Sequence, residues 1–127
     1  MRTSSAKAKG RRLQDEVRDA IRKAFPDLEP DDVLCAIMGQ SGMDIKLSPA
    51  ARKKFPYAVE CKNVEKLNIW GALKQAKENT PAGQTTLLAF TRNRTDTFVA
   101  LPLSDFMSLV ESKQQKPILL LEDKPTT

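Results

Sequence analysis

Apolar residues repeat at helical spacing near the start of the chain, and this pattern predicts a helix from about Lys9 to Phe25. The apolar stripe consists of Leu13, Val17, Ala20, Ile21 and Ala24. We expect the helix to end before Pro26, because proline lacks the backbone donor that a helix interior needs. Residues 1–8 are polar and basic, which favours a flexible arm ahead of the helix.

Three segments in the middle of the chain have the patterns of β-strands. Residues 33–38 form a continuous apolar run of strand length, whereas residues 43–47 and 57–63 alternate between apolar and polar positions. The alternation places Glu60 and Lys62 together on the polar face of the third segment. We therefore predict three strands before the next helix.

Helical and strand patterns continue in the second half of the chain. Asn68 is placed to cap a helix that extends to about Asn79. Residues 85–91 and 97–101 then have strand patterns, the first of them strongly apolar. Residues 48–56 form either a basic loop or a short helix that starts at its Ser-Pro pair.

The last part of the chain completes the predicted fold. Ser104 is placed to cap a short helix, and residues 118–121 are either a late strand or a packing segment. The order helix, three strands, helix, two strands, helix predicts an α/β fold with a mixed sheet of about five strands flanked by helices. Residues 57–91 are expected to form a parallel, right-handed strand–helix–strand crossover. We predict one domain over residues 9–122 and a flexible tail at residues 123–127.

Composition narrows the functional classes. The 127 residues carry a net charge of +5, which permits nucleic-acid binding. The absence of histidine excludes HNH nucleases, Ser-His-Asp triads and nearly every catalytic zinc site. No apolar run approaches the ~20 residues of a membrane span and no secretory signal is present, so we expect a cytoplasmic protein. Cys35 and Cys61 lie in apolar or alternating segments and are expected as small buried side chains.

Asp44, Glu60 and Lys62 form the group of residues that can carry chemistry. If the strand with Asp44 lies beside the strand with Glu60, two carboxylates meet at one sheet edge. Mg²⁺ is commonly held by one or two carboxylates with waters, and the Cys61 carbonyl is a natural further ligand. Such an ion polarises a phosphate and activates water, while Lys62 stabilises developing negative charge. The alternative explanation of the Glu-x-Lys pattern is a solvated strand face with a weak ion pair.

Four segments of the chain together resemble a known family. Their sequences are AKGRRLQDEV, SGMDIKL, YAVECKN and NIWGALKQA, and they cover roughly residues 9–92. They resemble the PD-(D/E)XK nuclease superfamily, most of all its small phage-encoded and Holliday-junction-resolvase-like members. Met43 stands where the family name has proline, and the spacing from Lys9 to Glu16 differs from the short form of archaeal junction resolvases.

The resemblance implies a restriction-endonuclease-like core and a role for each matching residue. Asp44 and Glu60 would bind Mg²⁺, for which Mn²⁺ could substitute, and Lys62 would assist catalysis. An acidic residue on the first helix often completes such sites, which points to Glu16, although a solvated helix glutamate is the alternative. Gln75 resembles the glutamine that many members place near the active site, and a solvated amide explains it equally well.

Basic and polar side chains elsewhere are candidate DNA contacts, because phosphate contacts orient a protein on DNA without reading sequence. These candidates are Lys9, Arg11, Arg12, Ser41, Arg52, Lys53, Lys54 and Lys74. Each of them alone is also explained as a solvated surface residue. Gly42 is expected to adopt a positive φ in the turn before Asp44. Trp70 lies among lysines on the second predicted helix and can either stack on a base or form a dimer contact.

These features predict a Mg²⁺-dependent DNA endonuclease that hydrolyses phosphodiester bonds, with branched DNA such as a Holliday junction as substrate. The resemblance implies a homodimer, because junction resolution needs two active sites. We expect neither a membrane partner nor a small-molecule cofactor. The alternatives are a non-specific, restriction-like or nicking nuclease on duplex DNA, and a non-catalytic DNA-binding protein of the same fold. A protein–protein module with a charged edge strand and a basic RNA-binding protein also stay open.

Overall fold

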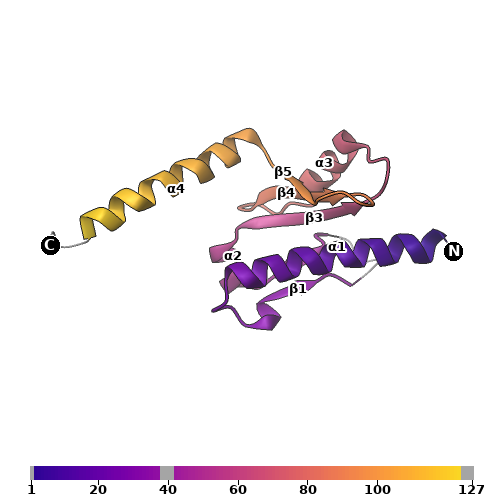
Figure 1. Ribbon diagram of the computed structural model, residues 1–127, viewed down its shortest axis with the longest axis horizontal. Coiled ribbons are helices and arrows are strands. Elements are labelled where there is room, and N and C mark those ends of the chain that lie inside the picture. The colour runs from indigo at the N-terminus through magenta and orange to yellow at the C-terminus, as the bar shows by residue number, and fades with distance from the viewer. Residues whose placement is uncertain (1, 38–41, 124–127) are drawn as a thin grey trace.

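The computed structural model describes the backbone of residues 2–37 and 42–123, and the side chains of residues 5–37 and 42–114. Helices and strands alternate along the chain, which confirms the predicted mixed α/β class (Figure 1). The elements are α1 (Arg2–Ala24), the 3₁₀ helix η1 (Pro30–Asp32), β1 (Val33–Cys35), β2 (Ile45–Leu47), α2 (Pro49–Lys54), β3 (Tyr57–Asn63), α3 (Ile69–Glu78), β4 (Thr85–Thr91), β5 (Phe98–Ala100) and α4 (Leu103–Asp123).

The strands form two ladders in place of the expected single mixed sheet. β1 pairs with β2 in antiparallel fashion, and β4 pairs with β3 on one side and β5 on the other. The predicted parallel pairing within residues 57–91 is confirmed, because Tyr57 lies opposite Thr85 and Asn63 opposite Thr91. β3 and β4 are therefore the centre of the fold, and their carboxyl ends point the same way.

Asp44 joins the two ladders and also interrupts them. Its N–H donates to the Val59 carbonyl at 3.0 Å, and its own carbonyl accepts the Ala36 N–H at 2.8 Å. Its carboxylate Oδ2 accepts the Cys61 N–H at 2.6 Å. A side-chain oxygen thus takes a donor that a backbone carbonyl takes in a regular ladder, so regular pairing does not continue from β2 to β3.

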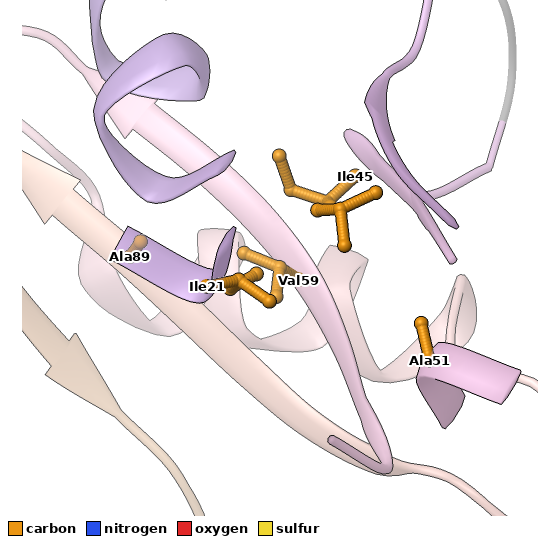
Figure 2. Close-up of a cluster of buried hydrophobic side chains, with 6 residues drawn as sticks. Ile21, Ile45, Ala51, Val59 and Ala89 are labelled. Atoms are coloured by element: carbon orange, nitrogen blue, oxygen red, sulfur yellow. The ribbon is translucent and has the colours of Figure 1, made fainter. Parts of the chain in front are cut away.

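The helices α1 and α3 cover opposite faces of the β3–β4 pair (Figure 1). The main core lies on the α1 side and consists of Ile21, Val33, Ile45, Ala51, Val59 and Ala89 (Figure 2). On the α3 side, Ala72 and Ala76 are buried together with Ala58 and Leu88 of the strands. Each fully buried Ile, Val or Leu stabilises the fold by about 1.5–3 kcal/mol relative to an exposed one.

Most local predictions in the centre of the chain are confirmed. Asn68 caps α3 by accepting the Gly71 N–H at 3.1 Å, as predicted. The short-helix alternative for residues 48–56 is the correct one, because Ser48 caps α2 through the Ala51 N–H at 3.1 Å. Gly42 has a φ of 100°, as expected for the turn before Asp44.

The start of the first helix was predicted wrongly. α1 begins at Arg2, so it includes the segment 2–8 that was expected as an arm. Alanine and lysine, which fill much of this segment, are strong helix formers, and no proline separates them from the apolar stripe. The helix therefore begins about two turns before the predicted start at Lys9.

The end of the fold also differs from the prediction. α4 runs from Leu103 to Asp123 and includes residues 118–121, so the late-strand alternative is wrong. Ser104 lies inside this helix and not at its cap, and the Pro102 carbonyl accepts the Asp105 N–H at 3.1 Å. The run at 118–121 lacks strand alternation, which leaves helix propensity to decide its conformation. α4 projects away from the β3–β4 pair and the two helices that cover it (Figure 1).

No helix of the described residues is both long enough and apolar enough to cross a bilayer. Strand β1 ends at Cys35. The predicted strand was expected to run over residues 33–38, and residue 38 lies outside the described residues. Residues 124–127 of the predicted tail lie outside them too. Both cysteines, Cys35 and Cys61, are half-buried free thiols.

Candidate active site

The edge of β3 that faces Asp44 is the starting point of the candidate site. The Cys61 N–H points to this edge, where it donates to Asp44 Oδ2 at 2.6 Å. The N–H and the C=O of one strand residue point to the same side of the strand, so the Cys61 carbonyl is directed to this edge as well. The structure thus places the Asp44 carboxylate beside the backbone carbonyl that was predicted as a further metal ligand.

Glu60 lies on the α3 face of β3 and is only 5% exposed. Its Oε1 accepts a hydrogen bond from Asn79 Nδ2 at 3.2 Å. Asn79 is the C-cap residue of α3, so the end of this helix fixes the orientation of a buried carboxylate. A buried charge needs such partners, because leaving it unpaired is costly.

The three predicted catalytic residues interact electrostatically. Burial raises the pKa of Glu60, and the negative charge of Asp44 raises it further, whereas Asn79 and Lys62 lower it. Burial also raises the pKa of Asp44, against the effect of the Cys61 N–H and the Lys62 charge. One lysine therefore interacts with both carboxylates, and the charge of Asp44 acts on Glu60.

The donor atoms at this edge suit a hard divalent cation. Two carboxylates and a backbone carbonyl are oxygen ligands, and Mg²⁺ commonly uses one or two carboxylates while it keeps several waters. The residues that would hold such an ion are Asp44, Glu60 and Cys61 through its carbonyl. Within the part of the chain that the structure describes, no group of three or more His, Cys, Asp or Glu side chains is arranged around a metal position.

Glu16 occupies a different place from the two carboxylates. Its Oε1 accepts a hydrogen bond from Thr97 Oγ1 at 2.9 Å. Its charge acts on the Cys61 thiol, whose pKa is raised mainly by burial and also by Asp44, Glu60, Cys35 and Glu16. Cys61 and Glu60 are consecutive in a strand, so their side chains point to opposite faces. The described contacts place Glu16 on the α1 face and do not bring it to Glu60.

Gln75 is exposed, and Asn79, one helical turn later, makes the contact with Glu60. The backbone N–H of Asn79 bonds to the Gln75 carbonyl at 3.0 Å, as expected for residues four apart in a helix. Asn79 was predicted only as the approximate end of this helix and not as a site residue. Its position at the end of the helix, where the chain turns toward the sheet, is the signal that could have identified it.

Three of the predicted DNA contacts are used inside the fold. Lys9 forms an ion pair with Glu65 at 3.3 Å, Arg52 donates to the Leu47 carbonyl at 2.8 Å, and Lys54 forms an ion pair with Asp27 at 2.8 Å. The other predicted cations are exposed or at the surface and make no side-chain hydrogen bond or ion pair with a described residue; they are Arg11, Arg12, Lys53 and Lys74. Ser41 lies outside the described residues.

Trp70 is 79% exposed on α3. It borders a groove of about 400 Å³ together with Leu73 and Lys77 of the same helix and residues 100–102. Both earlier interpretations, a base-stacking side chain and a dimer contact, require this exposure.

Comparison with known proteins found no match: no family model, no curated protein and no solved structure matches this chain. The resemblance to a nuclease superfamily therefore stays a prediction from the residues that carry it.

Proposed function

We propose that this protein is a Mg²⁺-dependent DNA endonuclease that hydrolyses phosphodiester bonds at the site formed by Asp44, Glu60 and Lys62. The observation that supports this most strongly is that half-buried Asp44 and buried Glu60 both interact with the same lysine, while the charge of Asp44 also acts on Glu60. One positive charge leaves the pair with an excess of negative charge, and buried uncompensated charge is costly. A divalent cation supplies the missing charge.

Each residue of the site has a definite part in this proposal. The Cys61 N–H holds Asp44 in place, and Asn79 holds Glu60, so the carboxylates are oriented before any ligand binds. A bound Mg²⁺ ion would polarise the scissile phosphate and lower the pKa of a coordinated water. Lys62 lies on the same strand face as Glu60 and stabilises negative charge that develops on the phosphoryl oxygens.

The finer parts of the proposal, branched DNA as substrate and a homodimer as the assembly, come from the family resemblance. The apolar surface of α4 supports the second part, because several of its large side chains are at least 45% exposed. They are Leu103, Phe106, Met107 and Leu109. Exposed apolar side chains gathered on one helix are typical of an association surface.

A cleavage assay tests the proposal. Purified protein is incubated with a four-way junction, a linear duplex and a single strand, in Mg²⁺, in Mn²⁺ and in EDTA. We expect metal-dependent cutting that falls by at least ~100-fold in Glu60→Gln and in Lys62→Ala. Glu78→Gln is the matched control, because it makes the same change at an exposed position of α3.

Cutting of the junction alone would support a resolvase-like preference. Cutting of every substrate would keep the nuclease and remove that preference. The proposal fails if the folded protein cuts nothing in either metal, or if Glu60→Gln cuts as well as wild type.

A further inference from the structure

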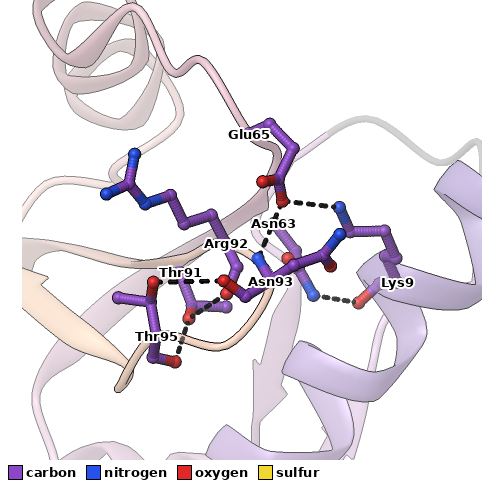
Figure 3. Close-up of polar contacts among 7 residues, drawn as sticks. All are labelled: Lys9, Asn63, Glu65, Thr91, Arg92, Asn93 and Thr95. Carbon is purple, nitrogen blue, oxygen red and sulfur yellow. Dashed lines mark hydrogen bonds and ion pairs between the residues drawn. The ribbon is translucent and has the colours of Figure 1, made fainter.

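A polar pocket of about 310 Å³ lies at the carboxyl end of the β3–β4 pair. Arg12 and Glu16 of α1 line one wall, Asn63 closes the end of β3, and Arg92 and Arg94 of the β4–β5 loop line the other wall. Three arginines therefore line one cavity, and the side chain of one of them, Arg92, extends away from α1 (Figure 3). None of the residues of the candidate active site lines it.

The loop that carries two of these arginines is held by its own hydrogen bonds (Figure 3). The Asn93 N–H donates to Glu65 Oε2 at 2.7 Å, which ties the loop to the segment after β3. Thr91 Oγ1 donates to the Thr95 carbonyl at 2.9 Å, and Thr95 Oγ1 donates to the Asn93 carbonyl at 3.2 Å. The loop therefore presents its arginines from a fixed backbone.

Some polar groups around the pocket are paired with one another, and others have no partner among the described residues. Lys9 is paired with Glu65, and its carbonyl accepts Asn63 Nδ2 at 2.9 Å, which fastens α1 to the end of β3 (Figure 3). Asn63 Oδ1 is buried without a hydrogen-bond partner among the described residues. The side chains of Arg12 and Arg94 likewise form no hydrogen bond or ion pair with the described part of the chain. Glu65 and Lys9 are thus paired with each other, and the guanidinium groups of Arg12 and Arg94 stay available.

Arg94 has a φ of 58°, in the left-handed region that suits glycine. A residue with a side chain is disfavoured there by roughly 1–2 kcal/mol. Glycine would make the same turn at lower cost, and no contact with a described residue explains an arginine. The side chain therefore costs the fold free energy without stabilising it, which is typical of a residue that serves a ligand.

We propose that this pocket binds a backbone phosphate of nucleic acid, away from the bond that is cut. The inference rests on the proposed function in taking DNA as the polymer. Guanidinium groups are the preferred protein partners of phosphate because their planar fork donates two hydrogen bonds at once. The two that pair with no described residue, those of Arg12 and Arg94, outweigh the one carboxylate of the pocket, Glu16, which is already bonded to Thr97.

The pocket and the candidate active site are close along β3 but lie on opposite faces of it, because Asn63 shares the α1 face with Cys61 whereas Glu60 lies on the α3 face. Asn63 follows Glu60 by three residues on β3. At a rise of ~3.3 Å per residue the two positions are about 10 Å apart along the strand. A phosphate in the pocket would therefore anchor the DNA backbone at the end of β3, on the face opposite Glu60.

Binding of a labelled duplex, measured by fluorescence anisotropy in EDTA over a range of salt concentrations, tests the proposal without cleavage. The test variant is the double substitution Arg12→Gln with Arg94→Gly. Lys23→Gln is the control, because it removes an exposed charge from the other end of α1. We expect the double variant to bind roughly fivefold to twentyfold more weakly and to lower the slope of log K against log salt by about 1, whereas the control keeps the wild-type slope.

The single variant Arg94→Gly guards against a trivial loss of folding, since it should melt at the same or a higher temperature than wild type. The proposal is overturned if the double variant keeps the wild-type slope, if Lys23→Gln lowers it equally, or if wild-type protein binds no duplex at low salt. A lowered slope in a protein that cuts no DNA would support this pocket and refute the nuclease.

Discussion

The two ends of the parallel β3–β4 pair use their charges differently. At the amino end the basic side chains bond to the fold itself: Arg22 to the carbonyls of Pro30 and Val33, Arg52 to that of Leu47, and Lys54 to Asp27. At the carboxyl end, Arg12 and Arg94 bond to no described residue, and Arg94 also occupies a disfavoured conformation.

The carboxylates extend the same contrast. Asp27, at the amino end, has its pKa lowered by Lys54, so its charge stabilises the fold. Asp44 and Glu60 have raised pKa values mainly because burial penalises their charged forms, so their charges destabilise the fold. Charge that costs stability is typical of functional sites, and charge that adds stability is typical of scaffolding. The number of charged residues in a sequence therefore does not show whether they stabilise the fold or serve a functional site.

The largest effect on stability is expected at the amino end. Arg22→Ala removes one guanidinium that bonds to two backbone carbonyls, each at 2.9 Å, and leaves both without that donor. We expect the free energy of unfolding to fall by about 2–3 kcal/mol, because hydrogen bonds from charged donors are among the stronger ones. Urea denaturation followed by circular dichroism measures the change. A loss below ~0.5 kcal/mol would contradict the assignment of this end as scaffolding.

Glu60→Gln is expected to have a smaller effect of the opposite sign. A raised pKa means that the folded state binds the proton more tightly than the unfolded state does, so ionisation costs stability as the pH rises above the ordinary value of 4.5. Glutamine keeps the acceptor for Asn79 and removes the charge. We expect the free energy of unfolding of the variant to rise relative to that of wild type between pH 4 and pH 7, by about 1 kcal/mol at pH 7.

Thermal unfolding of both proteins across this pH range, in EDTA and again with Mg²⁺, measures that gain. Bound Mg²⁺ should stabilise only the wild type and so narrow the difference. Wild type gaining on the variant with rising pH in EDTA would show that Glu60 stabilises the fold, as the amino-end charges do.

Lys54→Gln is expected to have the smallest effect. The pair with Asp27 lies at the surface, where solvent screens such interactions. We expect a melting temperature close to that of wild type and an unchanged salt dependence of DNA binding. A reduced salt slope would show that the basic residues of α2 contact DNA after all, and would weaken the contrast between the two ends.

Local patterns were sufficient to predict the central elements. The bounds of β3 and β4 and the Asn68 cap of α3 were predicted because alternation and capping depend on neighbouring residues only. Alternation fixed the face of the Glu60 side chain, but the convergence of Asp44 with Glu60 was expected only on the condition that their two strands lie side by side. The elements that failed, the start of α1 and the course of α4, lack an apolar pattern that distinguishes one conformation from another.

Contacts between distant residues could not be predicted in the same way. No sequence pattern shows that the Asp44 side chain, and not its backbone, takes the Cys61 N–H, because this depends on how β2 meets β3. The contact of Asn79 with Glu60 could not be predicted for a related reason. Gln75 and Asn79 lie on one helix flank, and only the packing of α3 on the sheet decides which of them reaches Glu60.

The hydrogen bond between Asp44 and Cys61 also links the folding of the chain to the assembly of the candidate active site. The two residues are 17 positions apart, so their contact exists only after β2 has docked against β3. A nascent or partly unfolded chain therefore has no assembled pair of carboxylates. If the pair binds metal, the ability to cut appears at the same step that completes the structure, and an unfinished chain is harmless to the DNA around it.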